Sequence, residues 1–359
     1  MNATFVIAEA GVNHNGDLEL AKRLVDIAVS SKADAVKFQT FKTELVISKH
    51  APKAEYQMQT TGEEESQFEM VKKLELSFDQ FRELKNYCED SGIEFLSTPF
   101  DIESADFLID ELKLRTIKIS SGEITNAPLL YHIACKKPDI ILSTGMATLS
   151  EVEAALGVIA FGLLSAHDQP SVSAFRAAYL SPEGQEQLQR KVKLLHCTTE
   201  YPAPVKDVNL LAIETMQKAF GLPVGYSDHT EGIAVTVAAV ALGARIIEKH
   251  ITHNKQAEGP DHKASLSPDE LKLLIESIRQ VELAKGTGIK IPAKSELKNL
   301  EIARKSIVAS KKIKVGEKLT LNNITIKRPG NGISPFEYWE MLTEEASKDF
   351  NQDEPLSRL

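Results

Sequence analysis

Residues 245–250 read RIIEKH, a short apolar run that ends in a glutamate, a lysine and a histidine. Seven similar runs lie in the first 250 residues: Phe5–Ala10, Ala35–Thr40, Glu94–Phe100, Thr116–Glu123, Asp139–Gly145, Val192–Cys197 and Val224–His229. Continuous apolar runs, as opposed to alternating ones, are typical of parallel strands buried on both faces. The pattern therefore predicts eight buried parallel strands.

Segments with helical periodicity separate most of these runs, as in Leu18–Ser30, Phe78–Ser91 and Val208–Ala219. Strand–helix alternation repeated eight times predicts an α/β fold, the (β/α)8 TIM barrel. The active site of such a barrel lies at the carboxyl ends of its strands. Those ends carry most of the chemically capable side chains here, so the sequence predicts an enzyme.

The chain is longer than a barrel requires, since its 359 residues exceed the roughly 250 of a typical example. We expect the barrel over residues 1–285 and a linker over 286–300, which begins GTGIKIP. A small β-rich domain is expected over 301–359. Its short β-like segments are Ser306–Ala309, Leu319–Leu321 and Ile324–Lys327.

Two connections in the barrel are long. Phe41–Gln67 follows the second strand, so it belongs to the catalytic face and is expected to form a wall or lid. Ser165–Lys191 precedes the sixth strand, on the opposite face. We expect this second insertion to serve stability or oligomer contacts.

Composition excludes several classes of function. The net charge of −9 disfavours nucleic acid or an anionic membrane as a partner. No apolar run approaches the roughly 18–20 residues of a membrane helix. The residues before the first strand have no basic or apolar leader pattern, so we expect no secretory signal, and the three cysteines show no paired metal spacing. These features predict reduced thiols and a cytoplasmic protein.

Two histidines, His229 and His250, end the neighbouring seventh and eighth strands. Adjacent parallel strands lie about 4.8 Å apart, so the two imidazoles could share one metal ion. Imidazole suits several divalent metals, and the ligands alone do not choose among them. Asp228 and Glu248 are candidates to orient the histidines. The alternative is two unrelated polar residues at strand ends.

Five cationic or hydroxyl side chains form a second cluster at the expected barrel mouth: Lys37, Lys118, Ser121, Ser143 and Ser227. Two ammonium groups and three hydroxyls suit a small, multiply charged anion such as a phosphate ester with a carboxylate. Gly122 and Gly145 would let backbone approach such a ligand. The cluster therefore predicts a phosphate-binding site.

Two carboxylates, Glu9 and Glu123, are the candidates for base, acid or acceptor of sugar hydroxyls. The structural alternative for each is an ion pair with Lys37 or Lys118. Three further residues could hold the hydroxyls of a sugar: Gln39, Tyr201 and Asp261.

The chain resembles bacterial sialic acid synthases. The motifs that carry the resemblance are IAEAGVNHNG (7–16), VKFQT (36–40), LSTPF (96–100), KISSGE (118–123), STGM (143–146), HCTTEYP (196–202), GYSDHT (225–230), IEKH (247–250), GPDH (259–262) and KRPGNG (327–332). They cover nearly the whole chain. There are departures as well, since many members carry proline at Ser120 and some carry asparagine near Thr198 and Thr199.

The resemblance implies condensation of phosphoenolpyruvate with an N-acyl mannosamine-type sugar, which gives a nonulosonic acid and phosphate by C–O cleavage. It implies that His229 and His250 hold a divalent ion, most often Mn2+, with Mg2+ or Co2+ also possible. Phosphoenolpyruvate would be bound by Lys37, Lys118, Ser121, Ser143 and Ser227. The sugar would be contacted by Glu9, Gln39, Tyr201 and Asp261, and Glu123 would serve catalysis.

The carboxyl-terminal segment looks like the family's SAF domain, which is similar to type III antifreeze protein. The resemblance implies a domain-swapped homodimer in which Arg328 reaches the sugar in the neighbouring subunit's site.

Several functions remain open. N-acetylmannosamine, giving N-acetylneuraminate, is the preferred acceptor. The alternative acceptor is 2,4-diacetamido-2,4,6-trideoxymannose, giving legionaminic acid, and the pseudaminic branch is less expected. A Schiff-base aldolase would use Lys118 as its nucleophile. A non-catalytic carbohydrate- or ice-binding protein is a further alternative. Such a protein would not need the two histidines and the paired lysines at the strand ends.

Overall fold

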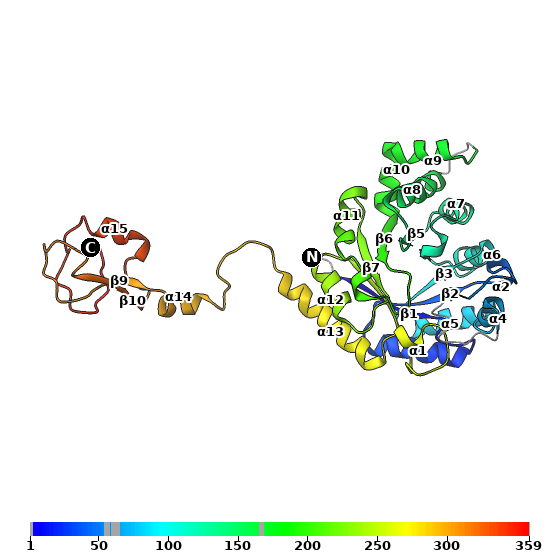
Figure 1. Cartoon of the computed structure of the whole chain (residues 1–359), viewed down its shortest axis with the longest axis horizontal. Coiled ribbons are helices and arrows are strands. Elements are labelled where there is room, and N and C mark those ends of the chain that lie inside the picture. Colours follow the sequence, from blue (N-terminus) through cyan, green and yellow to red (C-terminus); the bar gives the residue numbers. More distant parts are fainter. Residues whose placement is uncertain (1–2, 54–57, 59–64, 165–168, 359) are drawn as a thin grey trace. The chain divides into compact units, whose positions relative to one another are not determined.

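A computed structural model describes residues 3–53, 58, 65–164 and 169–358 of the chain. The chain divides into two compact units, Met1–Gly286 and Thr287–Leu359 (Figure 1). Each unit is described by itself below.

The first unit is a barrel of eight parallel strands surrounded by helices (Figure 1). The strands are β1 (Phe5–Gly11), β2 (Ala35–Thr40), β3 (Glu94–Pro99), β4 (Thr116–Ile119), β5 (Asp139–Ser143), β6 (Val192–Cys197), β7 (Val224–Asp228) and β8 (Ile246–His250). Their hydrogen-bonded order is β3-β2-β1-β8-β7-β6-β5-β4, a nearly closed barrel. The predicted TIM-barrel fold is confirmed.

The helices of this unit follow the strands in turn. They are α1 (Leu18–Ser30), α2 (Thr43–Val46), α4 (Gln67–Lys72), α5 (Phe78–Asp90), α6 (Ile102–Asp106), η1 (Phe107–Glu111), α7 (Ala127–Cys135), α8 (Leu149–Leu163), α9 (Val172–Leu180), α10 (Pro182–Lys191), η3 (Val205–Asp207), α11 (Leu211–Phe220), α12 (Ala234–Ala241), η4 (His262–Ala264) and α13 (Pro268–Lys285). Several begin at capping boxes. Before α5, the Ser77 hydroxyl oxygen accepts a hydrogen bond from the backbone N–H of Gln80. The side-chain oxygen of Gln80 accepts one from the backbone N–H of Ser77.

Side chains along each strand alternate between the barrel interior and the helices. The lower inward positions form an apolar layer of Ile7, Ala35, Leu96, Ile141, Leu195 and Ile246. Two residues further along the same six strands, the inward positions are Glu9, Lys37, Thr98, Ser143, Cys197 and Glu248. The barrel interior therefore changes from apolar to polar within one step of the strand repeat.

One strand is shorter than the sequence predicts. The run from Thr116 was expected to stay extended to Glu123, but β4 ends at Ile119 and the short 3-10 helix η2 covers Ser121–Glu123. The Ser120 hydroxyl accepts from the Gly122 amide at 3.3 Å and stabilises this turn.

The two long connections contain helices. The described part of Ser165–Lys191 forms α9 and α10, and α9 packs on α8, with the Phe161 and Phe175 rings 5.4 Å apart. Residues 165–168 lie outside the described part. Within Phe41–Gln67 the structure places α2, and α4 begins at Gln67. Residues 54–57 and 59–64 of this predicted wall also lie outside the described part.

The second unit is small and has its own core. Strands β9 (Ser306–Ala309) and β10 (Ile324–Lys327) pair antiparallel, accompanied by α14 (Leu297–Ala303), η5 (Pro335–Glu337) and α15 (Tyr338–Met341). The core residues are Ile307, Ala309, Ile313, Leu319, Ile324, Met341, Ala346, Phe350 and Leu356. The expected β-like segment Leu319–Leu321 is not a strand: the preceding Lys318 forms a single bridge with Glu345, and a turn begins at Leu321. None of the described helices is long and apolar enough to cross a lipid bilayer.

Candidate active site

A cavity of about 400 Å3 opens at the carboxyl ends of the barrel strands. Its lining includes these predicted site residues: Glu9, Lys37, Gln39, Lys118, Ser121, Ser143, Tyr201, Ser227, His229, His250 and Asp261. Such a volume lies in the usual range of small-molecule sites. The fold therefore brings the predicted anion, metal and sugar residues into one space.

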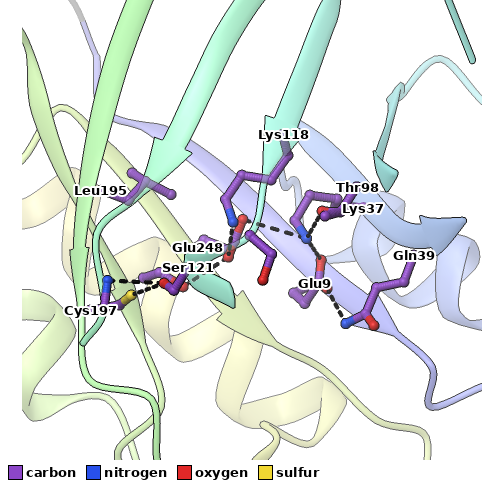
Figure 2. A network of polar contacts seen from close by, with 12 residues as sticks. Glu9, Lys37, Gln39, Thr98, Lys118, Ser121, Leu195, Cys197 and Glu248 are labelled. Carbon is purple, nitrogen blue, oxygen red and sulfur yellow. Dashed lines mark hydrogen bonds and ion pairs between the residues drawn. The ribbon is translucent and has the colours of Figure 1, made fainter. Parts of the chain in front are cut away.

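The floor of the cavity is a cluster of four buried charges (Figure 2). Lys37 Nζ lies 2.6 Å from Glu9 Oε2 and 3.6 Å from Glu248 Oε2. Lys118 Nζ lies 3.5 Å from Glu248 Oε1, which also accepts from the Ser227 hydroxyl at 2.8 Å. Two lysines thus face two glutamates, and the cluster is balanced before any ligand binds.

The two glutamates of this cluster have very different acidities. Burial raises the pKa of Glu9 to about 7, against the opposing effect of Lys37. Burial would also raise the pKa of Glu248, but Lys118 and Lys37 together lower it to about 2. Glu248 is therefore a fixed negative charge, and Glu9 is a group that can exchange a proton near neutral pH.

The lysines also differ. Burial lowers the pKa of Lys118. Burial acts the same way on Lys37, but the carboxylates of Glu248 and Glu9 outweigh it and raise the pKa of Lys37. Lys37 donates in addition to Thr98 Oγ1 at 3.1 Å. Lys37 is thus held as an ammonium between two carboxylates, whereas Lys118 is less firmly charged.

Hydroxyl groups complete the side of the cavity formed by β4, β5 and β6. The Gly145 amide donates to Ser121 Oγ at 3.0 Å, and Cys197 Sγ lies 3.1 Å from the same oxygen (Figure 2). A Cβ on Gly145 would meet Thr199 Oγ1 at 2.4 Å, so only glycine fits. The buried Ser143 hydroxyl has no hydrogen-bond partner within the described residues, and such a group is available to a ligand.

The two predicted metal histidines lie together, with ring centroids 5.6 Å apart. Tyr201 stacks on His229 at 4.1 Å and meets His250 edge-on at 5.5 Å. His229 Nδ1 lies 2.6 Å from the Thr198 carbonyl oxygen, which orients the ring. Asp261 Oδ2 lies 3.8 Å from His250 Nδ1.

The histidine pair fits a metal ion. Burial lowers the pKa of His229 to about 4 and that of His250 well below its ordinary value, so both imidazoles are neutral, as metal ligands must be. The buried Nδ1 of His250 has no hydrogen-bond partner in the described part of the chain. Among those residues no group of three or more His, Cys, Asp or Glu is arranged to hold a metal. An ion would therefore have two histidine ligands and open positions.

Asp228 does not orient either histidine. It points outward from the barrel, where it pairs with Lys249 at 3.0 Å and accepts from the Thr230 amide at 2.8 Å. The suggestion that it fixes a histidine tautomer is wrong, because residues on either side of an inward histidine face outward. The Thr198 carbonyl takes that place for His229.

Two predicted site residues lie elsewhere. Glu123 is half-buried and accepts from Asn126 Nδ2 at 2.6 Å, and it is not part of the described cavity lining. Glu123 also does not form the ion pair with Lys37 or Lys118 that was the structural alternative. Those lysines pair with Glu9 and Glu248 instead. Arg328 is exposed in the second unit.

Two parts of the cavity lie outside the site that the sequence predicts. Glu248 was considered only as a histidine partner, although its place two residues after inward-facing Ile246 marks it as a cavity residue. An apolar side was also missed, formed by Val12, Phe41, Met70, Val71, Leu74 and Phe100. The apolar residues of this side are scattered over loops and a short helix. Their spacing in the sequence has no regular period that would predict them.

Two family models match the chain. The NeuB family model matches residues 24–290, and the SAF domain model matches residues 304–358.

Curated relatives extend this match over the whole length. An N,N'-diacetyllegionaminic acid synthase of Campylobacter jejuni is 52% identical over 354 residues, 99% of each chain. The synthase of the same name from Legionella pneumophila is 46% identical, over 93% of this chain and 87% of its own. Human N-acetylneuraminate-9-phosphate synthase is 36% identical, over 90% and 82%.

Solved structures agree with the fold. An N-acetylneuraminic acid synthetase of Leptospira borgpetersenii, crystallised with citrate, has a TM-score of 0.66 and 35% identity, over 84% of this chain and 91% of that one. The spore coat polysaccharide biosynthesis protein SpsE of Bacillus subtilis has a TM-score of 0.61 and 32% identity, over 99% and 94%. The chain therefore belongs to the NeuB family of nonulosonic acid synthases and carries a C-terminal SAF domain.

Proposed function

We propose that the protein condenses phosphoenolpyruvate with 2,4-diacetamido-2,4,6-trideoxymannose to give N,N'-diacetyllegionaminic acid and phosphate. The support for this acceptor is the identity to two legionaminic acid synthases, 52% and 46%, against 36% for the human N-acetylneuraminate-9-phosphate synthase. A pseudaminic acid synthase of Campylobacter jejuni is 32% identical. This reverses the order expected from the motifs, which placed N-acetylmannosamine first.

Phosphoenolpyruvate is assigned to the side of the cavity that carries Lys118, Ser121, Ser143 and Ser227, with Lys37 beside it. The single observation that carries this assignment is the convergence of two buried lysines and three hydroxyls on one cavity that also holds the histidine pair. Charge-assisted hydrogen bonds from such groups are the strong contacts for phosphate and carboxylate oxygens. The unpartnered Ser143 hydroxyl is suited to one of them.

The reaction forms one carbon–carbon bond and breaks one carbon–oxygen bond. Carbon 3 of phosphoenolpyruvate attacks the aldehyde carbon of the open-chain sugar, and the aldehyde oxygen takes up a proton from water and becomes a hydroxyl. Water adds at carbon 2, which carries the developing positive charge. Phosphate then departs with its bridging oxygen, and the added hydroxyl gives up its proton to the phosphate and becomes the keto group. We assign Glu9 to take the proton of this water, because its pKa of about 7 suits proton exchange at neutral pH. Glu123 remains a prediction as a second catalytic carboxylate.

Enzymes of the NeuB family depend on a metal, and we propose that His229 and His250 hold it here. A divalent ion bound there would supply Lewis-acid polarisation of the sugar aldehyde. Mn2+ is the first choice, with Mg2+ and Co2+ as alternatives. Tyr201 packs on both rings and limits their rotation.

The remaining sugar contacts are assigned to Gln39, Tyr201 and Asp261, which line the same cavity. Gln39 Nε2 lies 3.4 Å from Glu9 Oε1, so it borders the proposed base. Arg328 is proposed to reach the sugar from a second copy of the chain in a domain-swapped homodimer.

A Schiff-base aldolase is the rival chemistry, because burial lowers the pKa of Lys118 and a neutral amine is a nucleophile. Phosphoenolpyruvate labelled with 18O at the bridging position separates the two. The synthase places the label in free phosphate, and release requires both sugar and metal. Covalent trapping of pyruvate on Lys118 by borohydride, without sugar-dependent phosphate release, would replace the proposal with the aldolase.

A further inference from the structure

One side of the catalytic cavity is apolar, and the proposed chemistry does not use it. The residues Val12, Phe41, Met70, Val71, Leu74 and Phe100, here called the apolar wall, all line the cavity. Val12, Phe41 and Leu74 form a small buried cluster separate from the main core, with Val71 and Phe100 packed against it. An apolar surface that belongs to a substrate cavity is a recognition surface.

Apart from Lys37 on β2, the anion-binding residues lie at different strands from the apolar wall. The wall comes from the ends of β1, β2 and β3 and from α4, whereas Lys118, Ser121, Ser143 and Ser227 come from β4, β5 and β7 or the turns that follow them. The histidine pair ends β7 and β8. We consider a sugar whose aldehyde lies at the histidines while phosphoenolpyruvate occupies the β4–β7 side. The opposite end of this sugar, which carries carbon 6, is then directed to the wall.

The wall is held in place by polar contacts behind it. Helix α4 begins at a capping box formed by Ser66 and Glu69. The Glu75 carboxylate accepts from the Thr43 amide at 3.0 Å and from its hydroxyl at 2.8 Å, which ties the end of α4 to α2. The Phe41 and Phe100 rings meet edge to face at 6.2 Å. The wall is therefore preformed, and a preformed apolar surface discriminates between a methyl and a hydroxyl group.

We infer that the apolar wall selects acceptor sugars that carry a methyl group at carbon 6, with Phe41, Val71 and Leu74 in contact with that methyl. This inference rests on the proposed synthase function. N-acetylmannosamine carries a hydroxyl at carbon 6, and a hydroxyl that loses water against these side chains gains no hydrogen bond from them. The trideoxy sugar presents a methyl group there instead.

The experiment compares two acceptors that differ only at carbon 6, N-acetylmannosamine and its 6-deoxy analogue. The wild-type protein is expected to show a kcat/KM for the 6-deoxy sugar at least about 10-fold higher, the lower end of what one such group contributes in an apolar pocket. Val71→Thr replaces one methyl group of the wall with a hydroxyl and keeps nearly the same side-chain shape. Phe41→Tyr adds a hydroxyl at a second position of the wall. Each variant is expected to reduce the ratio of the two kcat/KM values.

Val172→Thr is the matched control, because Val172 is 84% exposed on α9 and is not part of the cavity lining. It should leave the ratio unchanged. A wild-type protein without preference for the 6-deoxy sugar would overturn the inference, and so would a ratio that neither wall variant changes. Absence of phosphate release with every acceptor, the 2,4-diacetamido sugar included, would instead remove the proposed function and the inference together.

Discussion

At the scale of single residues, two glutamates in one cavity have acquired opposite properties. Glu9 and Glu248 both face Lys37, but only Glu248 also faces Lys118. Burial raises the pKa of Glu9 to about 7, while the two lysines lower that of Glu248 to about 2. A pair of carboxyl groups whose pKa values are driven apart is a common basis for assigning catalytic roles.

Glu9 is expected to set the acidic limb of the pH profile. Its raised pKa means that the carboxylate is lost as the pH falls through about 7, so kcat/KM should decline there. Glu9→Gln should remove this limb and lower kcat by roughly 10^2- to 10^4-fold, the usual contribution of a general base. Glu214→Gln, on the exposed face of α11, is the control. An unchanged pH profile in Glu9→Gln would assign the limb to another group.

The histidine pair is expected to bind the metal. His229→Ala and His250→Ala should each lower Mn2+ affinity by at least about 10-fold and abolish phosphate release. Calorimetric titration of the metal-free protein measures the affinity independently of turnover. His132→Ala changes a histidine of α7 that contacts Asp106 of α6, and this variant should bind Mn2+ like the wild type. Wild-type affinity in both cavity variants would show that the ion, if one binds, has other ligands.

Most site residues could be predicted from the sequence because each follows a buried strand. The strand repeat of two could also have found Glu248, since it stands two residues after inward-facing Ile246. The same rule assigns Asp228 to the outside, where the structure has it. The apolar wall could not be predicted, because Val12 and Leu74 meet only through the fold.

At the scale of secondary-structure elements, a buried ion pair joins the strands that carry the histidines. Asp228 and Lys249 are direct partners in the register between β7 and β8, and neither side chain is exposed. Asp228 also accepts from Tyr226 and Thr236, so its oxygens are satisfied. Each member precedes a histidine in the chain, so the pair fixes the register between the ends of β7 and β8 and does not contact either imidazole.

Breaking this pair is expected to cost stability and metal affinity together. Lys249→Met leaves Asp228 buried without its cation and should lower the free energy of unfolding by about 3–5 kcal/mol. The double variant Asp228→Asn with Lys249→Met should recover part of that loss. Urea unfolding and Mn2+ titration are the two measurements. Lys218→Met, which removes the exposed contact with Glu214, should change neither. A Lys249→Met protein with wild-type Mn2+ affinity would contradict the positioning role.

In the barrel, the predicted strand bounds differ from the observed ones by at most two residues, except where a local turn replaced a strand. The strand after Thr116 was expected to run to Glu123, but η2 follows Ile119 after one residue. In the turn, Ser121 lines the cavity while Glu123 bonds to Asn126. The Ser120 hydroxyl that supports the turn gives no distinctive pattern, so the sequence could not separate Ser121 from Glu123.

At the scale of the whole molecule, the second unit carries two large aromatic side chains that are mostly exposed. Phe336 is 95% exposed and Trp339 is 75% exposed, although the unit has a separate buried core. Large exposed aromatic residues mark interaction surfaces. This supports the proposal that the SAF domain contacts another copy of the chain, with Arg328 supplied to that copy's site.

Complementation between two impaired variants tests the swapped arginine. Arg328→Ala should mainly raise KM for the sugar, and His250→Ala should be inactive. Subunits mixed and allowed to exchange should regain activity above the sum of the separate proteins, because one site then has an intact barrel and an intact arginine. Strict additivity after confirmed exchange, or an Arg328→Ala protein with wild-type kinetics, would rule the arrangement out.

The reaction proposed for this barrel joins phosphoenolpyruvate to a 2,4-diacetamido sugar. Its most direct test is phosphate release by the metal-stripped protein after Mn2+ is restored, with each acceptor supplied separately. Release should require both the metal and a sugar, and kcat/KM should be higher for 2,4-diacetamido-2,4,6-trideoxymannose than for N-acetylmannosamine. A folded, metal-loaded protein that prefers N-acetylmannosamine, or releases no phosphate with either sugar, would contradict the account.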